Sequence, residues 1–383
     1  MLKTTTQQVS AVEVRRVVTD RDADLFLDLP AKIYANDPHW VPPLRSSVAK
    51  QFEQSNHFFE YGRLERFIAV TADNQAAGRI AAAVNDRLIA REGRKVGLFG
   101  FFECVDDADV AAALFDAACD WLKQQGMELA RGPIDLSTNK SCFFLVDGFD
   151  SAPYIMMPYN PPYYPRYIER AGWSKAKDAY AYDLPLTSLT GEFEKAYLIA
   201  CKAGVTFRSV RTKGEGFQQD CISLFHLFTD AFADSWSSSP HTEAEFIDEA
   251  QEMRTIVDPA IFWIAEYAGK MIGFFMALPD YNIPLMHVHG KLGLIGVLKL
   301  LWYRRKIDQA RVFAICALPG YQRKMVAPAL IYVGAKGGFV DKKKPYRRAE
   351  LSWVFEDNIL SRRVTEASGA KIYKTYRIYE KPL

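Results

Sequence analysis

The stretch IFWIAEYAGKMIGFFMALPD, residues 261–280, decides the fold. It consists of two runs rich in aromatic and branched side chains on either side of Ala268, Gly269 and Lys270. Two such runs around a short glycine-containing turn are typical of a β-hairpin. We therefore predict a hairpin here, and the order of the segments around it indicates the fold to which the hairpin belongs.

The hairpin lies among alternating strand and helix patterns in the second half of the chain. Before it, residues 205–211 predict a strand, and residues 221–232 and 242–257 predict helices. After it, the chain predicts strands at 310–319, 348–355 and 371–383 and helices at 328–340 and 358–370. The last helix pattern begins at Asn358, which is a typical N-cap residue.

The first half repeats this order of segments. Strand patterns occur at 12–18, 66–84 (a hairpin), 95–103, 127–134 and 178–184, and helix patterns at 22–34, 107–126 and 161–173. A chain of 383 residues also exceeds the length at which one core usually keeps growing. We predict two domains, 1–186 and 187–383, each an α+β unit with a mixed sheet, joined by a linker near residues 184–191.

The composition is that of a globular protein, with 49% hydrophobic and 25% charged residues. The N-terminal segment MLKTTTQQVS is polar and lacks the apolar stretch of a secretory signal, so we expect a cytoplasmic protein. Six cysteines are scattered without a CxxC pair, which favours reduced core thiols and predicts no metal site.

Positive charge is concentrated between Lys299 and Glu350, where 13 Lys or Arg and 3 Asp or Glu give 13 − 3 = +10. A basic zone of this kind suits phosphate groups or an anionic membrane surface, and a merely solvated face is the alternative. We expect no nucleic-acid partner.

Residues 280–310 form an insertion after the hairpin, with LGLIGVLKLLWYRRK at 292–306 in its centre. The apolar run is too short to cross about 30 Å of hydrocarbon. Its aromatic edge and cationic flank are typical of a helix at a membrane surface, and a buried core helix is the alternative. The neighbouring positive charge favours a peripheral contact of 292–306 with an anionic membrane, at the cytoplasmic face of the inner membrane.

Several short segments of the chain carry a resemblance to a known superfamily: residues 269–274, 322–327, 358 and 366–370 in the second half, and 77–80 and 168–173 in the first. Through them the chain resembles the GNAT superfamily of acyl-CoA N-acyltransferases over nearly its whole length. The phrases DPHWVPPL, GFFE, NPPYY and ELSWVFEDN are similar to a bacterial family of double-GNAT proteins, and within it to the bacterial ceramide synthase branch.

The resemblance implies two tandem GNAT-like domains that transfer an acyl group from acyl-CoA, as a co-substrate, to an amine by direct attack on the thioester. No tightly bound cofactor is expected. The branch that the chain resembles implies a long-chain, sphingoid-type base as acceptor. Two alternatives stay open: a small amine, amino acid or protein amino group as acceptor, or a non-catalytic protein that binds acyl-CoA or lipid.

In GNAT proteins a loop of pattern Q/R-x-x-G-x-G/A binds the pyrophosphate of coenzyme A with backbone N–H groups at a helix N-terminus. The matching residues here are Gln322, Arg323, Lys324, Met325, Val326 and Ala327. Met325 replaces the first glycine and disfavours a positive φ, while Arg323 and Lys324 add positive charge. The first half has an acidic segment at the equivalent position, 104–110, so coenzyme A is expected in the second domain. The thioester carbonyl is expected near the backbone N–H of Ala317 or Leu318.

A candidate general base is Glu350, which with Glu356 brackets an apolar strand. A carboxylate in such a strand is costly unless it is paired or functional. At a spacing of six residues the two side chains are predicted to share a face. The alternative for Glu350 is a structural pair with Arg347 or Arg348.

The general acid of many GNAT enzymes is a tyrosine four residues before the glycine of the last helix, and this chain has Thr365 there. Tyr373 or Tyr376 is the candidate replacement, with a core position as the alternative. His287 and His289 are further base candidates because an imidazole titrates near neutral pH.

The remaining candidates are expected to contact a substrate. The resemblance implies that Asn358 contacts the cofactor and that Trp236 lines the acceptor site. Further acceptor-site candidates are polar or aromatic residues on the strand 348–355 or around NPPYY: Trp353, Glu356, Asn139, Tyr159, Asn160 and Tyr163. The alternative for the last four is that they only seal the domain interface.

Overall fold

The structure is a computed structural model that describes residues 12–187, 191–232, 235–290 and 292–383. One continuous mixed sheet extends through the molecule in the order β1-β2-β3-β4-β5-β13-β7-β12-β11-β10-β9-β8, with β6 paired to β13. The strands of the first half are β1 Glu13–Arg16, β2 Gly62–Val70, β3 Ala76–Asn85, β4 Val96–Cys104, β5 Leu129–Gly132, β6 Phe144–Asp147 and β7 Ser174–Pro185. Those of the second are β8 Val205–Ser209, β9 Phe262–Tyr267, β10 Lys270–Pro279, β11 Gln309–Ala317, β12 Arg348–Phe355 and β13 Lys371–Pro382.

Helices cover both faces of this mixed sheet, so that each half has two hydrophobic cores. In the first half they are α1 Asp20–Ile33, α2 Arg45–Lys50, α3 Asp86–Glu92, α4 Ala108–Gln124 and α5 Tyr164–Arg170. In the second they are α6 Gly191–Lys202, α7 Gly214–Ala231, α8 Glu243–Met253, α9 Asn282–Leu285, α10 Leu294–Tyr303, α11 Val326–Ala335 and α12 Ile359–Ala367. Buried residues of α4 and α5 share one core of the first half, while α1 packs into the other. In the second half, α6 and α11 share one core and α7 contributes to the other.

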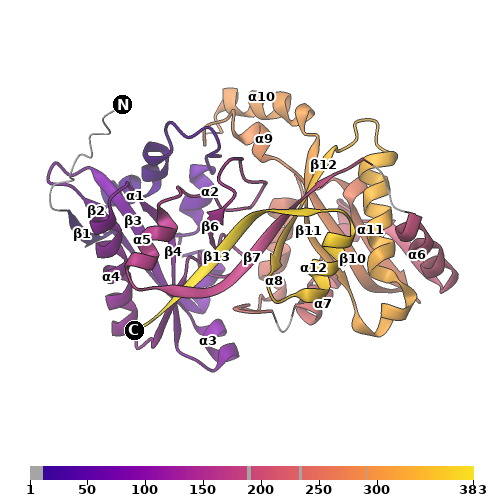
Figure 1. Cartoon of the computed structure of the whole chain (residues 1–383), viewed down its shortest axis with the longest axis horizontal. Helices are drawn as coiled ribbons and strands as arrows, with labels where there is room; N and C mark the ends of the chain where they lie inside the picture. Colours follow the sequence, from indigo (N-terminus) through magenta and orange to yellow (C-terminus); the bar gives the residue numbers. More distant parts are fainter. Residues whose placement is uncertain (1–11, 188–190, 233–234, 291) are drawn as a thin grey trace.

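The two halves exchange their last strands. The final strand of the second half, β13, pairs antiparallel with β5 of the first half, and the final strand of the first half, β7, pairs antiparallel with β12 of the second. β7 and β13 also pair with each other along most of their length. Figure 1 shows these two long strands crossing the centre of the molecule, between the first half on the left and the second half on the right. The boundary at 186/187 stays a prediction, but the sheets on either side of it are built from strands of both halves.

Most of the predicted elements are present because their signals are local. The decisive hairpin forms β9 and β10, and it turns at Ala268 and Gly269, both with positive φ. Asn358 caps α12 by accepting a hydrogen bond from the N–H of Ser361 at 3.1 Å, as predicted. The short elements α2, α3, α9 and β6 were not predicted, and neither was α6, which begins at the end of the predicted linker. Residues 188–190 of that linker lie outside the described residues.

The six cysteines are free, and five of them are buried as expected of core thiols. The sixth, Cys201, is exposed on α6.

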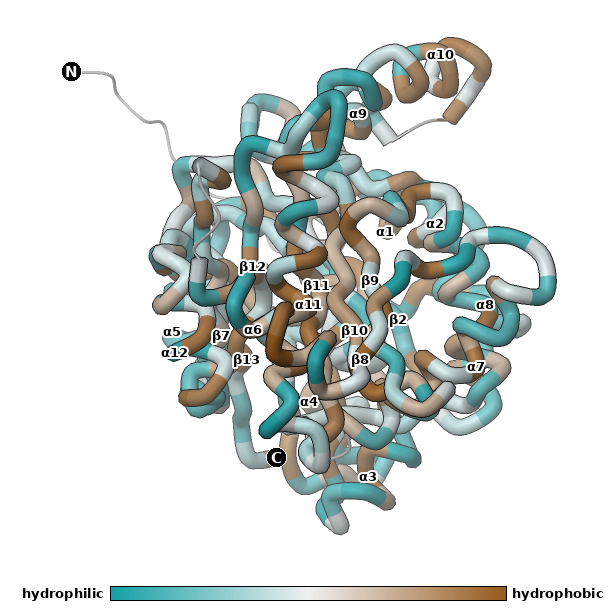
Figure 2. Tube along the Cα trace, turned by 90° about the vertical axis from the view of Figure 1, so that its right-hand side faces the viewer, coloured by the Kyte–Doolittle hydropathy of each residue, from teal (hydrophilic) through white to brown (hydrophobic). Residues whose placement is uncertain are grey.

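The insertion forms a helix, α10, that projects from the body of the molecule (Figures 1 and 2). Its apolar side chains are uncovered: Leu294 is 82% exposed, Ile295 72% and Leu298 60%. Only Gly296 of α10 is buried. The alternative of a buried core helix is therefore wrong. Within the described residues, no helix is both long and apolar enough to cross a bilayer.

Candidate active site

The parallel strands β11 and β12 separate near their middle. They are paired only from Gln309 and Arg348 to Val312 and Leu351, although both strands continue beyond that point. The pairing of β12 with β7 is also interrupted between Leu351 and Val354. We call the gap between β11 and β12 beyond Val312 and Leu351 the wedge. Beyond Val312 and Leu351 the two strands do not pair with each other, so backbone groups that face the wedge need other partners, as the carbonyl of Ser352 has in Arg311 at 3.2 Å.

The first half has a similar separation of β4 and β5, which pair only as far as Leu98 and Arg131. There the chain fills the gap itself. The N–H of Ile134 donates to the carbonyl of Phe99 at 2.7 Å, and the N–H of Phe101 donates to the carboxylate of Asp135 at 2.7 Å. Because these groups are already paired, a ligand would have to displace part of the chain to enter between β4 and β5.

Of the two backbone donors predicted for the thioester, the structure favours one. The N–H of Leu318 donates to the carbonyl of Ile272 at 2.9 Å, so it is not available to a ligand. Ala317, the residue before Leu318, lies opposite Gly273 on β10. Hydrogen-bonded and non-hydrogen-bonded pairs alternate along antiparallel strands, so Ala317 and Gly273 form a non-hydrogen-bonded pair. In such a pair the N–H of Ala317 points away from β10. The N–H of Ala317 therefore faces the wedge.

The predicted phosphate loop adopts the backbone conformation that its glycine pattern requires. Met325 has φ 58° and ψ 33°, in the left-handed region, and α11 starts at the next residue. The side chain of Met325 is 38% exposed, so it points into solvent and not into the core. The first N–H groups of α11 have no partner within the helix and are suited to an anion.

The two cations of the loop are in different situations. Arg323 is exposed, and its charge can add to the field of the helix N-terminus. Lys324 instead donates to the carbonyl of Ala203 at 3.1 Å and lies 4.1 Å from the ring centre of Tyr267. The ammonium of Lys324 is therefore already bound within the protein and is not free to contact a phosphate group. Of Gln322 only the backbone is described, and it belongs to the 3-10 turn Pro319–Lys324.

Glu350 lies at the centre of a buried hydrogen-bond network in β12. Its carboxylate accepts hydrogen bonds from the hydroxyl of Ser352, at 2.5 Å, and from the hydroxyl of Tyr373. The guanidinium of Arg311 on β11 lies 3.9 Å from the same carboxylate and donates to the Ser352 hydroxyl at 2.8 Å. We call Arg311, Glu350, Ser352 and Tyr373 the Glu350 network. The predicted alternative, a pair with Arg347 or Arg348, is wrong for Arg348, which pairs with Asp183.

Burial raises the pKa of Glu350 above its ordinary value, while Arg311 and the hydrogen bonds from Ser352 and Tyr373 oppose this rise. Burial also lowers the pKa of Arg311, and the carboxylate of Glu350 opposes that shift. A carboxyl with a raised pKa is suited to accept a proton near neutral pH.

Tyr373 is the only member of this network that reaches towards the surface, because it is half-buried whereas the other three are buried. Tyr376, the other tyrosine candidate, is fully buried, and its hydroxyl has no partner among the described residues. The structure thus joins Glu350 to Tyr373, two residues that the sequence singled out separately. Arg311 and Ser352 were missed. A charged residue within the apolar run 310–317 is a signal that could have indicated Arg311.

The first half contributes to the surroundings of the Glu350 network. The carbonyl of Ile155 accepts from Arg311 at 3.0 Å, and the N–H of Ile155 donates to Asp280 at 2.9 Å. Burial raises the pKa of Asp280 to about 6. Lys374, next to Tyr373, donates to the carbonyls of Gly148 and Ser151 at 2.5 and 2.8 Å. The network therefore lies at the junction of both halves.

The two histidine candidates lie apart from these contacts, in the insertion. His287 is exposed and stacks on Tyr303 of α10, with ring centres 3.6 Å apart. Partial burial and the neighbouring Lys306 lower the pKa of His287. His289 is also exposed. Within the part of the chain that the structure describes, no hydrogen bond or ion pair joins either imidazole to Glu350, so their catalytic role stays a prediction. Among the described residues, no group of three or more His, Cys, Asp or Glu side chains is arranged to hold a metal ion.

Aromatic residues from both halves form one cluster beside β12. Phe143 of the first half packs on Trp353, with ring centres 5.1 Å apart, and on Phe355 at 6.2 Å. Trp236 packs on Phe355 at 6.1 Å and under the guanidinium of Arg131 at 4.6 Å. The structure thus connects two acceptor-site candidates, Trp236 and Trp353, that are far apart in the sequence. Asn139 is close by, since its amide donates to the carbonyl of Ser239 at 3.3 Å.

The other acceptor-site candidates are engaged in structural contacts. Glu356 forms an ion pair with Lys175 at 2.7 Å near the surface, so it does not share the buried environment of Glu350. The buried amide of Asn160 accepts from the N–H of Leu145 and donates to two carbonyls. Tyr159 donates to Asp37 at 2.9 Å, and Tyr163 donates to the carbonyl of Cys104 at 2.8 Å. The contacts of Tyr159, Asn160 and Tyr163 lie within the first half and do not seal an interface between the halves, so the role of these residues at the acceptor site stays a prediction.

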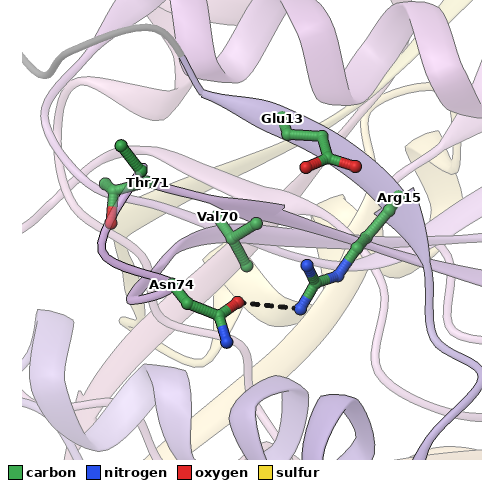
Figure 3. Close-up of a pocket in the computed structure, with 6 residues that line it drawn as sticks. Glu13, Arg15, Val70, Thr71 and Asn74 are labelled. Atoms are coloured by element: carbon green, nitrogen blue, oxygen red, sulfur yellow. Dashed lines mark hydrogen bonds between the residues drawn. The ribbon is translucent and has the colours of Figure 1, made fainter.

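A polar depression of about 330 Å³ lies elsewhere, along the edge strand β1. Figure 3 shows Glu13 and Arg15 of β1 above Val70, Thr71 and Asn74, with Arg15 donating to Asn74 at 2.9 Å. Arg15 also pairs with Asp22 at 2.9 Å. β1 is at the opposite end of the sheet order from β11 and β12, so this depression is not part of the wedge.

Comparison with known proteins gives a consistent assignment. No model of a protein family matches the chain. It is 32% identical over 374 residues to the bacterial ceramide synthase of Caulobacter vibrioides (strain NA1000 / CB15N), covering 96% of each chain. It is 31% identical over 376 residues to protein YghO of Escherichia coli (strain K12), covering 97% of this chain and 95% of that protein.

Two solved structures have the same fold over nearly their whole length. One is a tandem GNAT protein from the clavulanic acid biosynthesis pathway, with a TM-score of 0.59, 11% identity, and coverage of 97% of this chain and 98% of that chain. The other is a GCN5-related N-acetyltransferase from Sphaerobacter thermophilus, with a TM-score of 0.52, 13% identity, and coverage of 97% and 95%. At these identities the likeness shows the fold alone, and it is the tandem GNAT fold that the sequence predicted. Together with the two sequence relatives, it establishes that the chain is an acyltransferase of the tandem GNAT family that includes the bacterial ceramide synthase.

Proposed function

We propose that this protein transfers a fatty acyl group from acyl-CoA to the primary amine of a long-chain, sphingoid-type base at a membrane surface. Its relative in Caulobacter vibrioides is named a bacterial ceramide synthase. The observation in this chain that carries the lipid acceptor is α10, which exposes Leu294, Ile295 and Leu298 and is followed by Arg304, Arg305 and Lys306. An enzyme for a small polar amine has no need of such a surface, whereas a lipid acceptor reaches the enzyme from a bilayer.

Coenzyme A is proposed to bind to the second half. The left-handed conformation of Met325 and the start of α11 suit the pyrophosphate, and the exposed Arg323 adds charge. The gap between β4 and β5 of the first half is closed by Ile134 and Asp135. The wedge between β11 and β12 is accordingly the proposed place for the thioester, with the N–H of Ala317 as a donor to its carbonyl oxygen.

In the proposed reaction the neutral amine attacks the thioester carbon, a C–N bond forms and the C–S bond breaks. The amine loses a proton and the departing thiolate takes up a proton, so the products are an amide and coenzyme A. Tyr373 connects the buried carboxylate of Glu350 to the surface, and the pair is proposed to accept the proton of the amine. Arg311 and Ser352 are positioning residues, because they hold the carboxylate of Glu350 in place.

An acyl-transfer assay tests the proposal. The purified protein is incubated with anionic vesicles that contain a sphingoid base, and palmitoyl-CoA or acetyl-CoA is the acyl donor. We expect an N-palmitoyl amide, detected by mass spectrometry, at a rate at least 10-fold above that with acetyl-CoA. As a control, the sphingoid base is replaced by a small amine without a hydrocarbon chain, such as an amino acid. This amine should react slowly with either acyl donor. Transfer of acetyl groups alone, or equal rates with the small amine, would refute the lipid acceptor.

A further inference from the structure

An apolar cavity of about 90 Å³ lies between the sheet and the helices α11 and α12, and Leu184 of β7 also lines it. Val312 and Leu351 line it from the strands, Gly334 and Ala335 from α11, and Val364 from α12. Because Val312 and Leu351 are the last paired residues before β11 and β12 separate, the cavity borders the closed end of the wedge.

The cavity lies beyond the part of the wedge nearest the phosphate loop. Met325 of the loop is the N-cap of α11, whereas the cavity contacts α11 at Gly334 and Ala335. At a rise of 1.5 Å per residue these positions are about 14 Å further along the helix. A ligand whose phosphates bind at the start of α11 and whose thioester lies in the wedge would therefore have its acyl group next to the cavity.

The chemistry of the walls suits a hydrocarbon and not the amide-bearing arm of coenzyme A. The hydroxyls among the lining residues are occupied where the structure gives their bonds: Tyr346 donates to Asp258 at 2.7 Å, and Ser368 donates to the carbonyl of Thr365 at 2.6 Å. An amide placed here would lose its hydrogen bonds to water and find few replacements. A chain of methylene groups has no such cost.

The outer wall, α12, buries few of its side chains and is held to its neighbours by hydrogen bonds from Tyr182 to Glu366 at 3.2 Å and from Arg362 to the carbonyl of Glu356 at 3.0 Å. Thr365 is its only buried residue, whereas Ile359, Leu360 and Val364 are exposed, Leu360 to 76%. For comparison, an engineered apolar cavity of about 150 Å³ holds one benzene molecule. The present volume therefore admits only a few carbons, and a longer chain needs α12 to move outwards. Such a chain would at the same time cover the exposed apolar side chains of α12.

We infer that this cavity binds the hydrocarbon tail of a fatty acyl-CoA, and that α12 moves away from the sheet to admit tails longer than a few carbons. The inference rests on the proposed function and assigns the acyl-chain site within it. The tail enters past Val312 and Leu351 and lies between α11 and α12, where its length is limited by Ala335 and the residues behind it.

The substitution Ala335→Phe tests this inference, because it fills the cavity from a half-buried helix position. Equilibrium binding of palmitoyl-CoA, below its micellar concentration, and of acetyl-CoA is measured by tryptophan fluorescence. We expect the wild-type protein to bind palmitoyl-CoA at least 10-fold more tightly than acetyl-CoA. In the variant, palmitoyl-CoA should bind about 10-fold more weakly, which corresponds to the loss of roughly two buried methylenes, while acetyl-CoA changes less than 2-fold.

The matched control is Ala367→Phe, which adds the same ring to an exposed position on α12 that does not line the cavity. It should bind both ligands like the wild type. Ser368→Leu fills the cavity from the side of α12. It replaces Ala335→Phe in the test if circular dichroism shows that Ala335→Phe does not fold. Equal effects on the two ligands, or no effect on either, would overturn the cavity assignment but leave the proposed function intact. Absence of binding of any acyl-CoA to the wild type would instead overturn the proposed function itself.

Discussion

Arg311 and Glu350 form a charge pair in the interior of the molecule, with exposed fractions of 1% and 0%. Removing one partner of such a pair leaves an uncompensated buried charge and costs about 3–5 kcal/mol of stability. A loss of activity in a Glu350→Ala variant would therefore not distinguish catalysis from misfolding. Tyr373 offers a milder test, because its hydroxyl reaches Glu350 from a half-buried position.

We expect Tyr373→Phe to lower kcat by about 10²-fold and to change its pH dependence. A base is active when deprotonated, so activity should rise with pH through the pKa of Glu350. The hydrogen bond from Tyr373 lowers that pKa, and its removal raises it. The acidic limb of the profile of kcat against pH should consequently shift to higher pH.

Tyr376→Phe is the control, because the Tyr376 hydroxyl is buried without a partner among the described residues. Its removal should leave the acidic limb in place and cost little stability. Identical pH profiles for the two variants would contradict a proton-transferring role for Tyr373.

Met325 has a strained backbone conformation in the phosphate loop. For a residue with a side chain, the left-handed conformation raises the free energy of the folded state by about 1 kcal/mol or more. Met325→Gly should relieve this strain, raise the melting temperature slightly, and bind coenzyme A about 3-fold to 10-fold more tightly, because the backbone becomes more accessible. Isothermal titration with coenzyme A measures the affinity.

The comparison for this variant is Ala268→Gly, at the hairpin turn, where Ala268 also has a positive φ of 49°. It releases similar strain at a distance from the loop, so it should raise the melting temperature without changing coenzyme A affinity. If both glycine variants alter the affinity equally, the local interpretation of Met325 is wrong.

Among the elements, α10 and α6 both expose leucine and isoleucine side chains, but they differ in their surroundings. α10 projects from the molecule next to Arg304 and Arg305, whereas α6 packs against α11 and shares a core with it. A projecting apolar helix beside cations suits the interface of an anionic bilayer. The exposed residues of α6 are not part of such a surface.

Leu294→Glu combined with Leu298→Glu should reduce binding to vesicles rich in phosphatidylglycerol at least 10-fold, measured by flotation, because two charges replace two inserted side chains. Both positions are exposed, so the fold should be retained. Leu198→Glu combined with Ile199→Glu on α6 is the matched double variant and should float like the wild type. Equal flotation of both double variants would argue against α10 as the contact.

For the whole molecule, the exchange of β7 and β13 makes the two halves dependent on each other. β13 supplies a neighbour for β5 in the first half, and β7 supplies one for β12 in the second. Without these strands each half would expose an unpaired sheet edge. The Glu350 network and the aromatic cluster around Phe143 lie at the same junction and also need both halves.

A protease site inserted after Thr187 tests this dependence. After cleavage the two fragments should stay together in size-exclusion chromatography and unfold in one transition, because the exchanged strands hold them. The uncut protein with the same insertion is the reference. Separation of the fragments without denaturant, or two independent melting transitions, would show that the halves are autonomous domains.

Local features of the chain could be predicted from the sequence because their causes lie within a few residues. Two runs of aromatic and branched residues around Ala268 and Gly269 made the hairpin of β9 and β10 predictable. The N-cap residue Asn358 likewise marked the start of α12. The apolar run of α10 could be recognised as well, but not whether it was buried. That depended on the rest of the molecule, which leaves the helix uncovered.

The candidate site was predictable only in part, for the same reason. Glu350 and Tyr373 stood out as residue types in their segments, yet only the adjacent strands bring them together with Arg311 and Ser352. Two further hydrogen bonds likewise connect distant segments: one from Lys324 to the carbonyl of Ala203, and one from the N–H of Leu318 to the carbonyl of Ile272. The sequence alone thus determined most of the strands and helices and the chemically distinctive residues, because these depend on local pattern, and it indicated the family through its resemblance to GNAT proteins. Tertiary structure decided that the last strands are exchanged and that the site needs both halves, because strand pairing and the burial of charge depend on contacts between residues far apart in the chain.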